Sequence, residues 1–385
     1  MARTQAMLLA LVLGLASLSA ALANAQEPVF ETRASHAVIM DFDTGEILFS
    51  KDGDIPMPPS SMSKLMTALM VFEALEAGTL SLDDELPVSV RAWREGGSAS
   101  GGSTMFLNVN SRARVDDLLR GIIVQSGNDA CIVVAEAIGG TEEAFADMMT
   151  RRARELGLST ANFTNSTGLT HPEHRVSAAD LARLARHIIQ NHPEFYRIYS
   201  ETSFTYNGIS QANRNPLLGV FDGADGLKTG FTSEAGYGLT ASAVRGSERR
   251  IIVFNGMETM RDRANEAERL MRAAFSDFVL ANLAEPGRVI GEAQVYMGQS
   301  QTVPVRTSEA VRAAMHRRER QGLRAELVYD GPLRAPVAEG DEVGRLVVTL
   351  PGGRELSYPV EAAANVERKG MVSRAMSALV NLIRG

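Results

Sequence analysis

The chain has 385 residues, enough for one domain of about 250 residues and a smaller one. Hydrophobic residues make up 45% of it and charged residues 22%, the composition of a soluble globular protein. A net charge of −7 gives no electrostatic reason to expect a nucleic acid as a partner.

Residues 1–25 have the pattern of a secretory signal peptide. MARTQ carries one cation, MLLALVLGLASLSAALA is apolar, and Ala23-Asn24-Ala25 supplies small residues at the cleavage positions. We expect export and a mature chain that begins near Gln26. The alternative is a retained membrane anchor, because the apolar run nearly reaches spanning length.

Residues 35–281 predict an α+β domain. Residues 35–50 indicate two strands around a turn at Asp43-Thr44-Gly45, and strands return from Asp225 before a helix at 261–280. Between them lie five segments with helical periodicity: SKLMTALMVFEALEAG, VDDLLRGIIV, NDACIVVAEAIGG, TEEAFADMMTRRARELG and SAADLARLARHIIQNH. Strands at both ends with helices between them predict one antiparallel sheet packed with a helical layer.

The segment PPSSMSKLM, residues 58–66, holds three serines beside one of the four lysines of the chain. In a helix, Ser61 and Lys64 lie on one face about a turn apart. Ser60 has nearly equivalent geometry but is the natural N-cap after two prolines, and Ser63 points elsewhere. A nucleophilic serine needs a base, and a lysine serves only when its amine is neutral.

Two further motifs follow this segment. Ser126-Gly127-Asn128 stands between two apolar helices and could be merely a helix stop and an N-cap. Lys228-Thr229-Gly230 could be merely a strand leaving a turn, although its glycine lets a ligand approach the strand edge closely. The ordered set S-x-x-K, S-x-N, K-T-G is the signature of penicillin-binding proteins and class A β-lactamases.

The sequence resembles the low-molecular-mass penicillin-binding proteins that act as D-alanyl-D-alanine carboxypeptidases. Besides the three motifs, the resemblance includes the segments STMFLNVNSRARVDDLLRGIIVQSGNDAC, FTYNGISQANRNPLL and DGLKTGFTSEAGYGLTASA. It implies the β-lactamase/transpeptidase-like fold and a peptidoglycan stem peptide ending in D-Ala-D-Ala as substrate. It also implies that β-lactam antibiotics are covalent inhibitors.

The resemblance further assigns roles to the motif residues. It implies that Ser61 attacks the penultimate carbonyl, that Lys64 takes its proton, and that Ser126 relays a proton to the leaving amine. Asn128 would hold Lys64 and the substrate amide. Lys228 and Thr229 would bind the terminal carboxylate beside Gly230, and Lys228 would also keep Lys64 neutral.

Other assignments from the resemblance lie around these residues. Backbone N–H groups of Ser61 and Phe231 would form the oxyanion hole. Phe231 stands where the best-known relatives have His, which puts a polar side-chain contribution there in doubt. Arg263 matches an arginine of the carboxylate region, with Arg261 as its rival, and Ser103 matches a serine beside the site.

Two other functions remain open from the sequence. A class A β-lactamase positions water with a Glu in an E-x-x-L-N segment, whereas NSTGLTHPEHRVSAADL offers only Glu173, with the wrong neighbours. A fold that binds cell wall without catalysis is the other alternative, and the intact motif residues disfavour it. We therefore expect a carboxypeptidase that penicillin acylates and that releases it slowly.

The remaining segments predict a small β domain and a membrane tail. Residues 282–365 alternate in the manner of strands and contain no catalytic constellation, with the catalytic domain expected at 26–281. Residues 366–385 predict an amphipathic helix, with an apolar face and cations elsewhere, that lies on an anionic membrane or docks on the protein. We expect a location at the periplasmic face of the inner membrane.

No metal, cofactor or disulfide is expected. The sequence has neither a phosphate loop nor a dinucleotide fingerprint, and Cys131, the only cysteine, lies in an apolar run typical of a protein core. Its six histidines show no spacing typical of metal ligands: His36, His171, His174, His187, His192 and His316.

Overall fold

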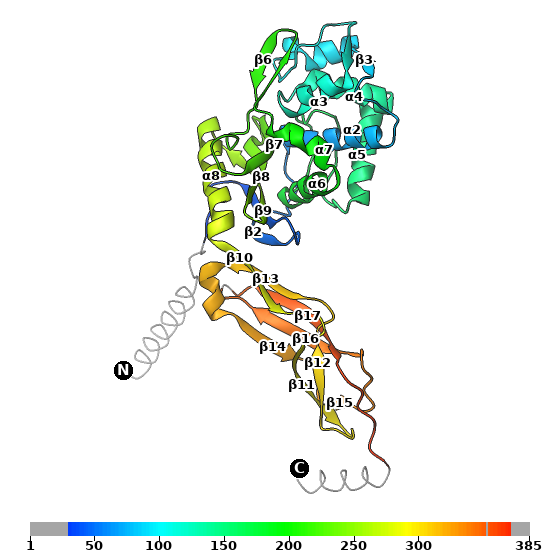
Figure 1. Ribbon diagram of the computed structural model, residues 1–385, viewed down its shortest axis with the longest axis vertical. Coiled ribbons are helices and arrows are strands. Elements are labelled where there is room, and N and C mark those ends of the chain that lie inside the picture. Colours follow the sequence, from blue (N-terminus) through cyan, green and yellow to red (C-terminus); the bar gives the residue numbers. More distant parts are fainter. Residues whose placement is uncertain (1–29, 352, 371–385) are drawn as a thin grey trace, which may run out of the picture. The chain divides into compact units, whose positions relative to one another are not determined.

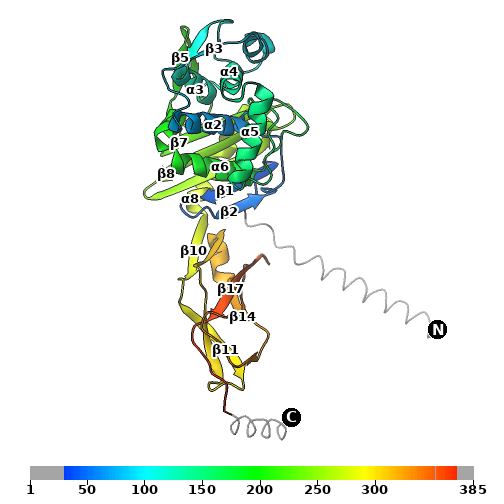
Figure 2. The same cartoon turned by 90° about the vertical axis from the view of Figure 1, so that its right-hand side faces the viewer.

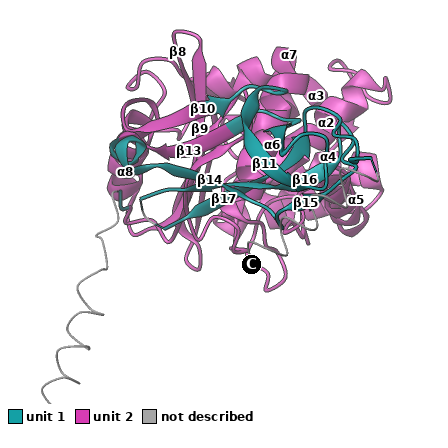
Figure 3. Cartoon of the chain, turned by 90° about the horizontal axis from the view of Figure 1, so that it is seen from below, with its two compact units in different colours: residues 1–31, 283–311, 318–385 teal, residues 32–282, 312–317 magenta. Residues whose placement is uncertain are grey.

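A computed structural model describes residues 30–351 and 353–370, which form two compact units. The larger unit comprises residues 32–282 and 312–317, and the described part of the smaller unit comprises the rest (Figure 3). The predicted signal peptide and residues 371–385 of the predicted tail lie outside the described residues. No described helix combines the length and apolar character that crossing a bilayer requires.

Within residues 32–282 an antiparallel sheet of five strands lies between helical layers (Figures 1 and 2). Helix α8 (Met260–Ser276) packs on β8 and β9 on one side, and α6 (Ala178–Asn191) packs on β1 and β9 on the other. The strand order is β2 (Ile47–Lys51), β1 (His36–Asp41), β9 (Glu248–Met257), β8 (Gly236–Arg245) and β7 (Ala224–Thr232).

The α+β expectation is therefore confirmed: the two strands predicted within residues 35–50 are β1 and β2, and all five predicted helices are present. The predicted helix at 261–280 is too long: α8 ends at Ser276, and Phe278 begins a strand. The other helices are α2 (Lys64–Glu76), α3 (Val115–Ile123), α4 (Asn128–Gly139), α5 (Glu142–Glu155) and α7 (Pro193–Tyr196).

Short strand pairs in the larger unit were not predicted. They are β3 (Glu85–Pro87) with β4 (Arg112–Arg114) and β5 (Ser203–Tyr206) with β6 (Ile209–Ala212). Where the chain passes between the units, β10 (Phe278–Ala284) pairs with β13 (Val311–His316).

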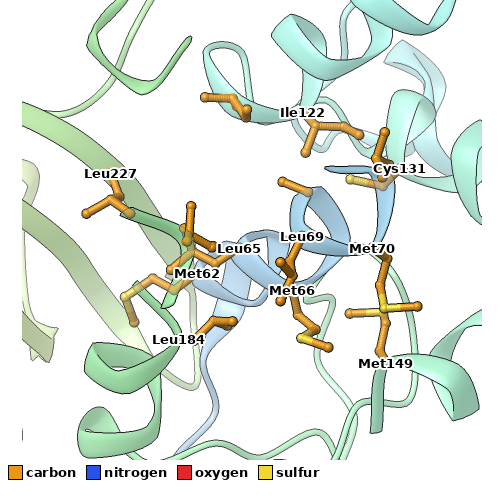
Figure 4. Packing of buried hydrophobic residues seen from close by; sticks show 14 of the residues in the cluster. Met62, Leu65, Met66, Leu69, Met70, Ile122, Cys131, Met149, Leu184 and Leu227 are labelled. Carbon is orange, nitrogen blue, oxygen red and sulfur yellow. The ribbon is translucent and has the colours of Figure 1, made fainter. Parts of the chain in front are cut away.

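Helix α2 is the centre of the larger unit. Every residue from Lys64 to Phe72 is buried, so the helix is enclosed on all sides instead of presenting one apolar stripe. Figure 4 shows its leucines and methionines packed against side chains from α3, α4, α5, α6 and β7. Cys131 of α4 belongs to this core, as predicted. Because α2 is held on every side, the residues at its start have fixed positions.

The smaller unit is built from strands, as its alternating sequence predicts. Its described residues contain a six-stranded sheet with buried valines and alanines along its strands. Val366 and Arg368 continue this unit, because they form isolated β-bridges with Val337 and Gly298. The described start of the predicted tail is therefore extended chain and not the predicted helix. The strand order is β14 (Arg324–Val328), β16 (Glu342–Thr349), β17 (Glu355–Ala362), β12 (Thr302–Arg306), β11 (Val289–Tyr296) and β15 (Leu333–Arg334).

We predict that Leu69→Ala lowers the free energy of unfolding of the larger unit by about 2–5 kcal/mol, since it leaves a cavity in a core that cannot collapse freely. The single tryptophan, Trp93, lies in this unit, so its fluorescence during urea unfolding reports on this unit. Val220→Ala, at a side chain that is 70% exposed, is the control and should change stability by no more than about 0.5 kcal/mol. Equal effects of the two changes would contradict the central role of α2.

Candidate active site

A cavity of about 790 Å³ opens where α2, α4, β7 and α8 come together. Eight of the ten residues predicted for the site line it: Ser61, Ser103, Ser126, Asn128, Thr229, Gly230, Phe231 and Arg263. The other two, Lys64 and Lys228, are buried behind the wall, with exposed fractions of 1% and 3%. The rival Arg261 is exposed and does not line the cavity.

The Lys64 amine is held at three points. Its Nζ lies 3.0 Å from Ser61 Oγ and 2.8 Å from Asn128 Oδ1, and it also contacts the backbone carbonyl of Thr167. Two of these three partners are amide carbonyl oxygens, which only accept hydrogen bonds. These contacts bring together the S-x-x-K and S-x-N motifs, which are far apart in the sequence, and add the backbone carbonyl of Thr167.

A polar network fixes the loop that presents the Thr167 carbonyl. Asn165 Oδ1 accepts hydrogen bonds from the backbone N–H groups of Thr167 and Gly168 at 3.1 and 2.7 Å. Buried Glu142 accepts from the Ser166 N–H at 3.0 Å and from its hydroxyl at 2.6 Å. The carbonyl contribution of Thr167 was missed, because any residue type can supply it and the sequence carries no signal for it.

The backbone around the two serine motifs is tightly turned. Ser60 and Ser126 have φ values of 47° and 63°, in the left-handed region that is unusual for residues other than glycine. The prediction that Ser60 caps the helix is wrong: its hydroxyl donates to the Pro59 carbonyl at 2.7 Å and α2 has no side-chain cap. A Cβ at Gly230 would come within 2.2 Å of Ser60 Oγ and 3.1 Å of the Pro59 carbonyl oxygen, so glycine lets β7 pass this turn without displacing the Ser60 hydroxyl.

Two arginines border the cavity. Arg214 Nη1 donates to Ser103 Oγ at 2.5 Å, and Arg263 Nη2 donates to the Arg214 carbonyl at 3.3 Å. The Arg263 Nε is buried and has no hydrogen-bond partner among the described residues. Arg214 lies in the family-like segment FTYNGISQANRNPLL, but its place at the site was not predicted.

The electrostatics of the cavity are cationic. Burial lowers the pKa of Lys64, and the charge of Arg214 lowers it further, while Asp129 and Glu142 oppose the shift from a distance. Burial and the charge of Lys64 bring the pKa of Lys228 well below its ordinary value. Within the described chain no carboxylate lines the cavity, and Glu173 lies outside its wall. The cavity is thus suited to an anionic ligand.

One side of the cavity is apolar. Phe231 is 48% exposed and stacks on Tyr237, with ring centroids 4.1 Å apart. Leu169 and Met260 line the same cavity with side chains 48% and 64% exposed. A ligand would therefore meet charged and hydroxyl groups at one place and large apolar side chains at another.

Comparisons with known proteins agree with this geometry. A family model described as D-alanyl-D-alanine carboxypeptidase matches residues 21–259, and one described as penicillin-binding protein 5, C-terminal domain, matches residues 278–368. The chain belongs to the D-alanyl-D-alanine carboxypeptidase family. The serine-type D-Ala-D-Ala carboxypeptidase expected from the sequence is confirmed as its enzyme class.

Relatives of this carboxypeptidase match nearly its whole length. D-alanyl-D-alanine carboxypeptidase DacD of Escherichia coli is 36% identical over 349 residues, which is 89% of each chain. The DacD structure from Francisella tularensis has a TM-score of 0.77 at 30% identity and covers 89% of this chain and 96% of that one. Penicillin-binding protein 5 of Haemophilus influenzae has a TM-score of 0.68 at 34% identity, with coverages of 89% and 100%. These structures support the fold of both units.

We predict that Arg214→Gln raises the pKa of both buried lysines, because removing a nearby positive charge makes their protonation easier. The carboxypeptidase has only four lysines, so the side-chain carbons of lysine can be labelled with ¹³C and assigned by substitution. Their NMR titration gives each pKa directly. Arg261→Gln removes an exposed arginine and should leave both values unchanged; unaltered titration in Arg214→Gln would show that the two lysines do not sense this charge.

Proposed function

We propose that the carboxypeptidase removes the terminal D-alanine of peptidoglycan stem peptides through an acyl-enzyme on Ser61. The observation that carries this proposal is the contact of 3.0 Å between Lys64 Nζ and Ser61 Oγ, at the wall of a cationic cavity. Such a contact is what a serine nucleophile and its base require. The neighbouring Ser60 and Ser63 hydroxyls instead donate to the backbone carbonyls of Pro59 and Ser60.

The hydrogen bonds of Lys64 fit a neutral base. A neutral amine has two hydrogens, and the carbonyl oxygens of Asn128 and Thr167 can accept both of them. The lone pair of the Lys64 nitrogen can then accept the proton of the Ser61 hydroxyl. The lowered pKa of Lys64 supports this state, because burial disfavours the charged amine. Asn128 therefore orients the base as well as a substrate amide.

The reaction proceeds in two steps. Ser61 Oγ bonds to the penultimate D-alanine carbonyl carbon as its proton passes to Lys64, and the peptide bond to the terminal D-alanine breaks. Ser126, which lines the cavity, relays a proton to the departing amine. Water then hydrolyses the ester and regenerates Ser61. The N–H groups of Ser61 and Phe231 stabilise the oxyanion in both steps.

The substrate carboxylate binds at the arginine side of the cavity. Thr229, Arg214 and Arg263 line the same space, and the buried Arg263 Nε has no hydrogen-bond partner among the described residues. Lys228 lies behind Thr229 and donates a hydrogen bond to the Thr229 backbone carbonyl at 3.1 Å. Gly230 keeps β7 close enough for a peptide to lie along it.

β-Lactam antibiotics would acylate the same serine. A β-lactam presents a reactive carbonyl and an anionic group, which match the nucleophile and the cationic wall. Rapid release would need a group that activates water, and the described cavity lining has no carboxylate for this purpose. This observation disfavours a β-lactamase of the class A type. The full catalytic set likewise disfavours a module that only binds cell wall.

Export and membrane attachment complete the proposal. Residues 1–25 act as a signal peptide, and residues 371–385 hold the enzyme at the periplasmic face of the inner membrane. The sequence supports an in-plane helix, because cations lie off the apolar face formed by Val372, Ala375, Met376, Leu379, Val380 and Ile383. In this arrangement the smaller unit stands between the anchor and the catalytic unit along the chain.

We predict that Ser61→Ala lowers D-alanine release from a peptide ending in Lys-D-Ala-D-Ala by at least about a thousandfold, as loss of a nucleophile does. Ser63→Ala removes a nearby hydroxyl that bonds the Ser60 carbonyl and should retain most activity. Mass spectrometry should find a penicillin adduct on every variant except Ser61→Ala. Release that survives in Ser61→Ala would refute the assignment, and rapid penicillin turnover would favour a β-lactamase.

We predict that ending the chain after Gly370 moves the enzyme from the membrane fraction to the soluble one without loss of peptidase activity. This truncation keeps Val366 and Arg368, which bridge to the smaller unit. Vesicles with and without anionic lipid, mixed with the full-length and shortened proteins, measure the attachment directly. Unchanged fractionation would mean that the tail docks on the protein instead.

A further inference from the structure

A cluster of two histidines and a glutamate lies at the ends of α2 and α6, among residues that the active site does not use. One carboxylate oxygen of Glu73 and one ring nitrogen each of His187 and His192 all lie within 4.8 Å of one another. Glu73 belongs to the last turn of α2, whereas the histidines stand near and just after the end of α6. This cluster could not be predicted from residue spacing, because Glu73 comes from a helix that is distant in the sequence from the two histidines.

His192 has an unused nitrogen. Its side chain is 5% exposed, and its Nδ1 lies 2.9 Å from the carboxylate of Glu76. Its Nε2 is buried and has no hydrogen-bond partner in the described structure. An imidazole that donates one N–H to a carboxylate presents the lone pair of its other nitrogen, which is the usual arrangement of a metal-binding histidine.

His187 can supply the second nitrogen. Its Nδ1 lies 3.1 Å from the amide of Asn191, an exposed side chain, which leaves Nε2 for a ligand. In a metal-bound form the His187 proton lies on Nδ1, and the Asn191 amide turns its oxygen toward it.

The charges around the cluster favour a divalent cation. Glu73 pairs with Arg152 at 2.9 Å, and Arg152 also pairs with Glu155 at 2.9 Å. The three glutamates at positions 73, 76 and 155 therefore outnumber the single arginine, which leaves a surplus of two negative charges. Arg152 occupies part of the Glu73 carboxylate, but a carboxylate accepts about four contacts and has room for an ion as well.

We propose that Glu73, His187 and His192 bind a divalent transition metal, with zinc the best match, and that Glu76 is the hydrogen-bonding partner that orients His192. Two imidazole nitrogens and one carboxylate oxygen are ligands that zinc prefers, with water as a fourth. Ligands at about 2.0–2.1 Å from zinc lie closer together than the present spacing. The side chains of Glu73 and His187, which are only partly buried, must therefore move inward by about an ångström.

Such an ion would tie two core helices together. It would bridge the end of α2, the helix that starts at Lys64, to the junction of α6 and α7. A ligand that binds only the folded state stabilises it in proportion to the logarithm of its concentration. The site lies outside the residues that line the peptidase cavity, so its role is to stabilise the larger unit and the proposal does not depend on the peptidase mechanism.

The test is calorimetric titration of zinc chloride into tag-free, chelator-treated full-length protein. We expect one ion per chain and a higher thermal unfolding temperature with zinc than without it. His187→Gln should abolish the specific binding, and Glu76→Gln should weaken it roughly 10- to 100-fold, as loss of an orienting partner does. Cobalt in place of zinc should give the visible absorption of a site with nitrogen and oxygen ligands.

Two further variants separate binding from folding. His192→Phe keeps an aromatic ring beside Phe72, which also stacks on Phe195, so it should fold but lose the zinc-dependent gain in unfolding temperature. His171→Gln changes an exposed histidine outside the cluster and should bind zinc as the unaltered protein does. Absence of binding, or binding that persists in both His187→Gln and His192→Phe, would overturn the proposal.

Discussion

The structure depends on one buried amine. Lys64 stands at the start of a helix enclosed on all sides, with its Nζ out of water and held by Ser61, Asn128 and Thr167. A charged amine in such a place is costly, whereas a neutral one is satisfied by two carbonyls and a hydroxyl. The three partners come from three separate segments of the larger unit. The packing of the whole unit therefore favours the neutral amine that the proposed role of Lys64 as a base requires.

The cavity in front of this amine has a positively charged side and an apolar side. Arg214 and Arg263 provide positive charge where an anionic end of the substrate can bind, and Phe231 on Tyr237 provides an apolar wall. The same positive charge lowers the pKa of the lysines behind the wall. In the proposed mechanism, substrate recognition and activation of the nucleophile therefore draw on the same positive charge.

Much of the fold could be predicted from the sequence because it follows from local rules. Helical periodicity located five helices. The three-residue spacing of Ser61 and Lys64 places their side chains together as predicted, although the turn between them is a 3₁₀ turn. The cap role of Ser60 failed because this residue adopts a left-handed turn and its hydroxyl donates to the Pro59 carbonyl instead of to the helix. Thr167 acts through its backbone, and Arg214 reaches the site only through tertiary packing, so no motif indicates either.

The core position of Cys131 has a practical consequence for studying the enzyme. Burial raises the pKa of its thiol to about 12, and the reactive form of cysteine is the thiolate. The Cys131 thiol is therefore unreactive toward alkylating reagents while the protein is folded. Two introduced surface cysteines, one in each unit, would then be the positions that take a fluorophore or spin label. Distances between the two units in solution thus become measurable without first removing a native residue.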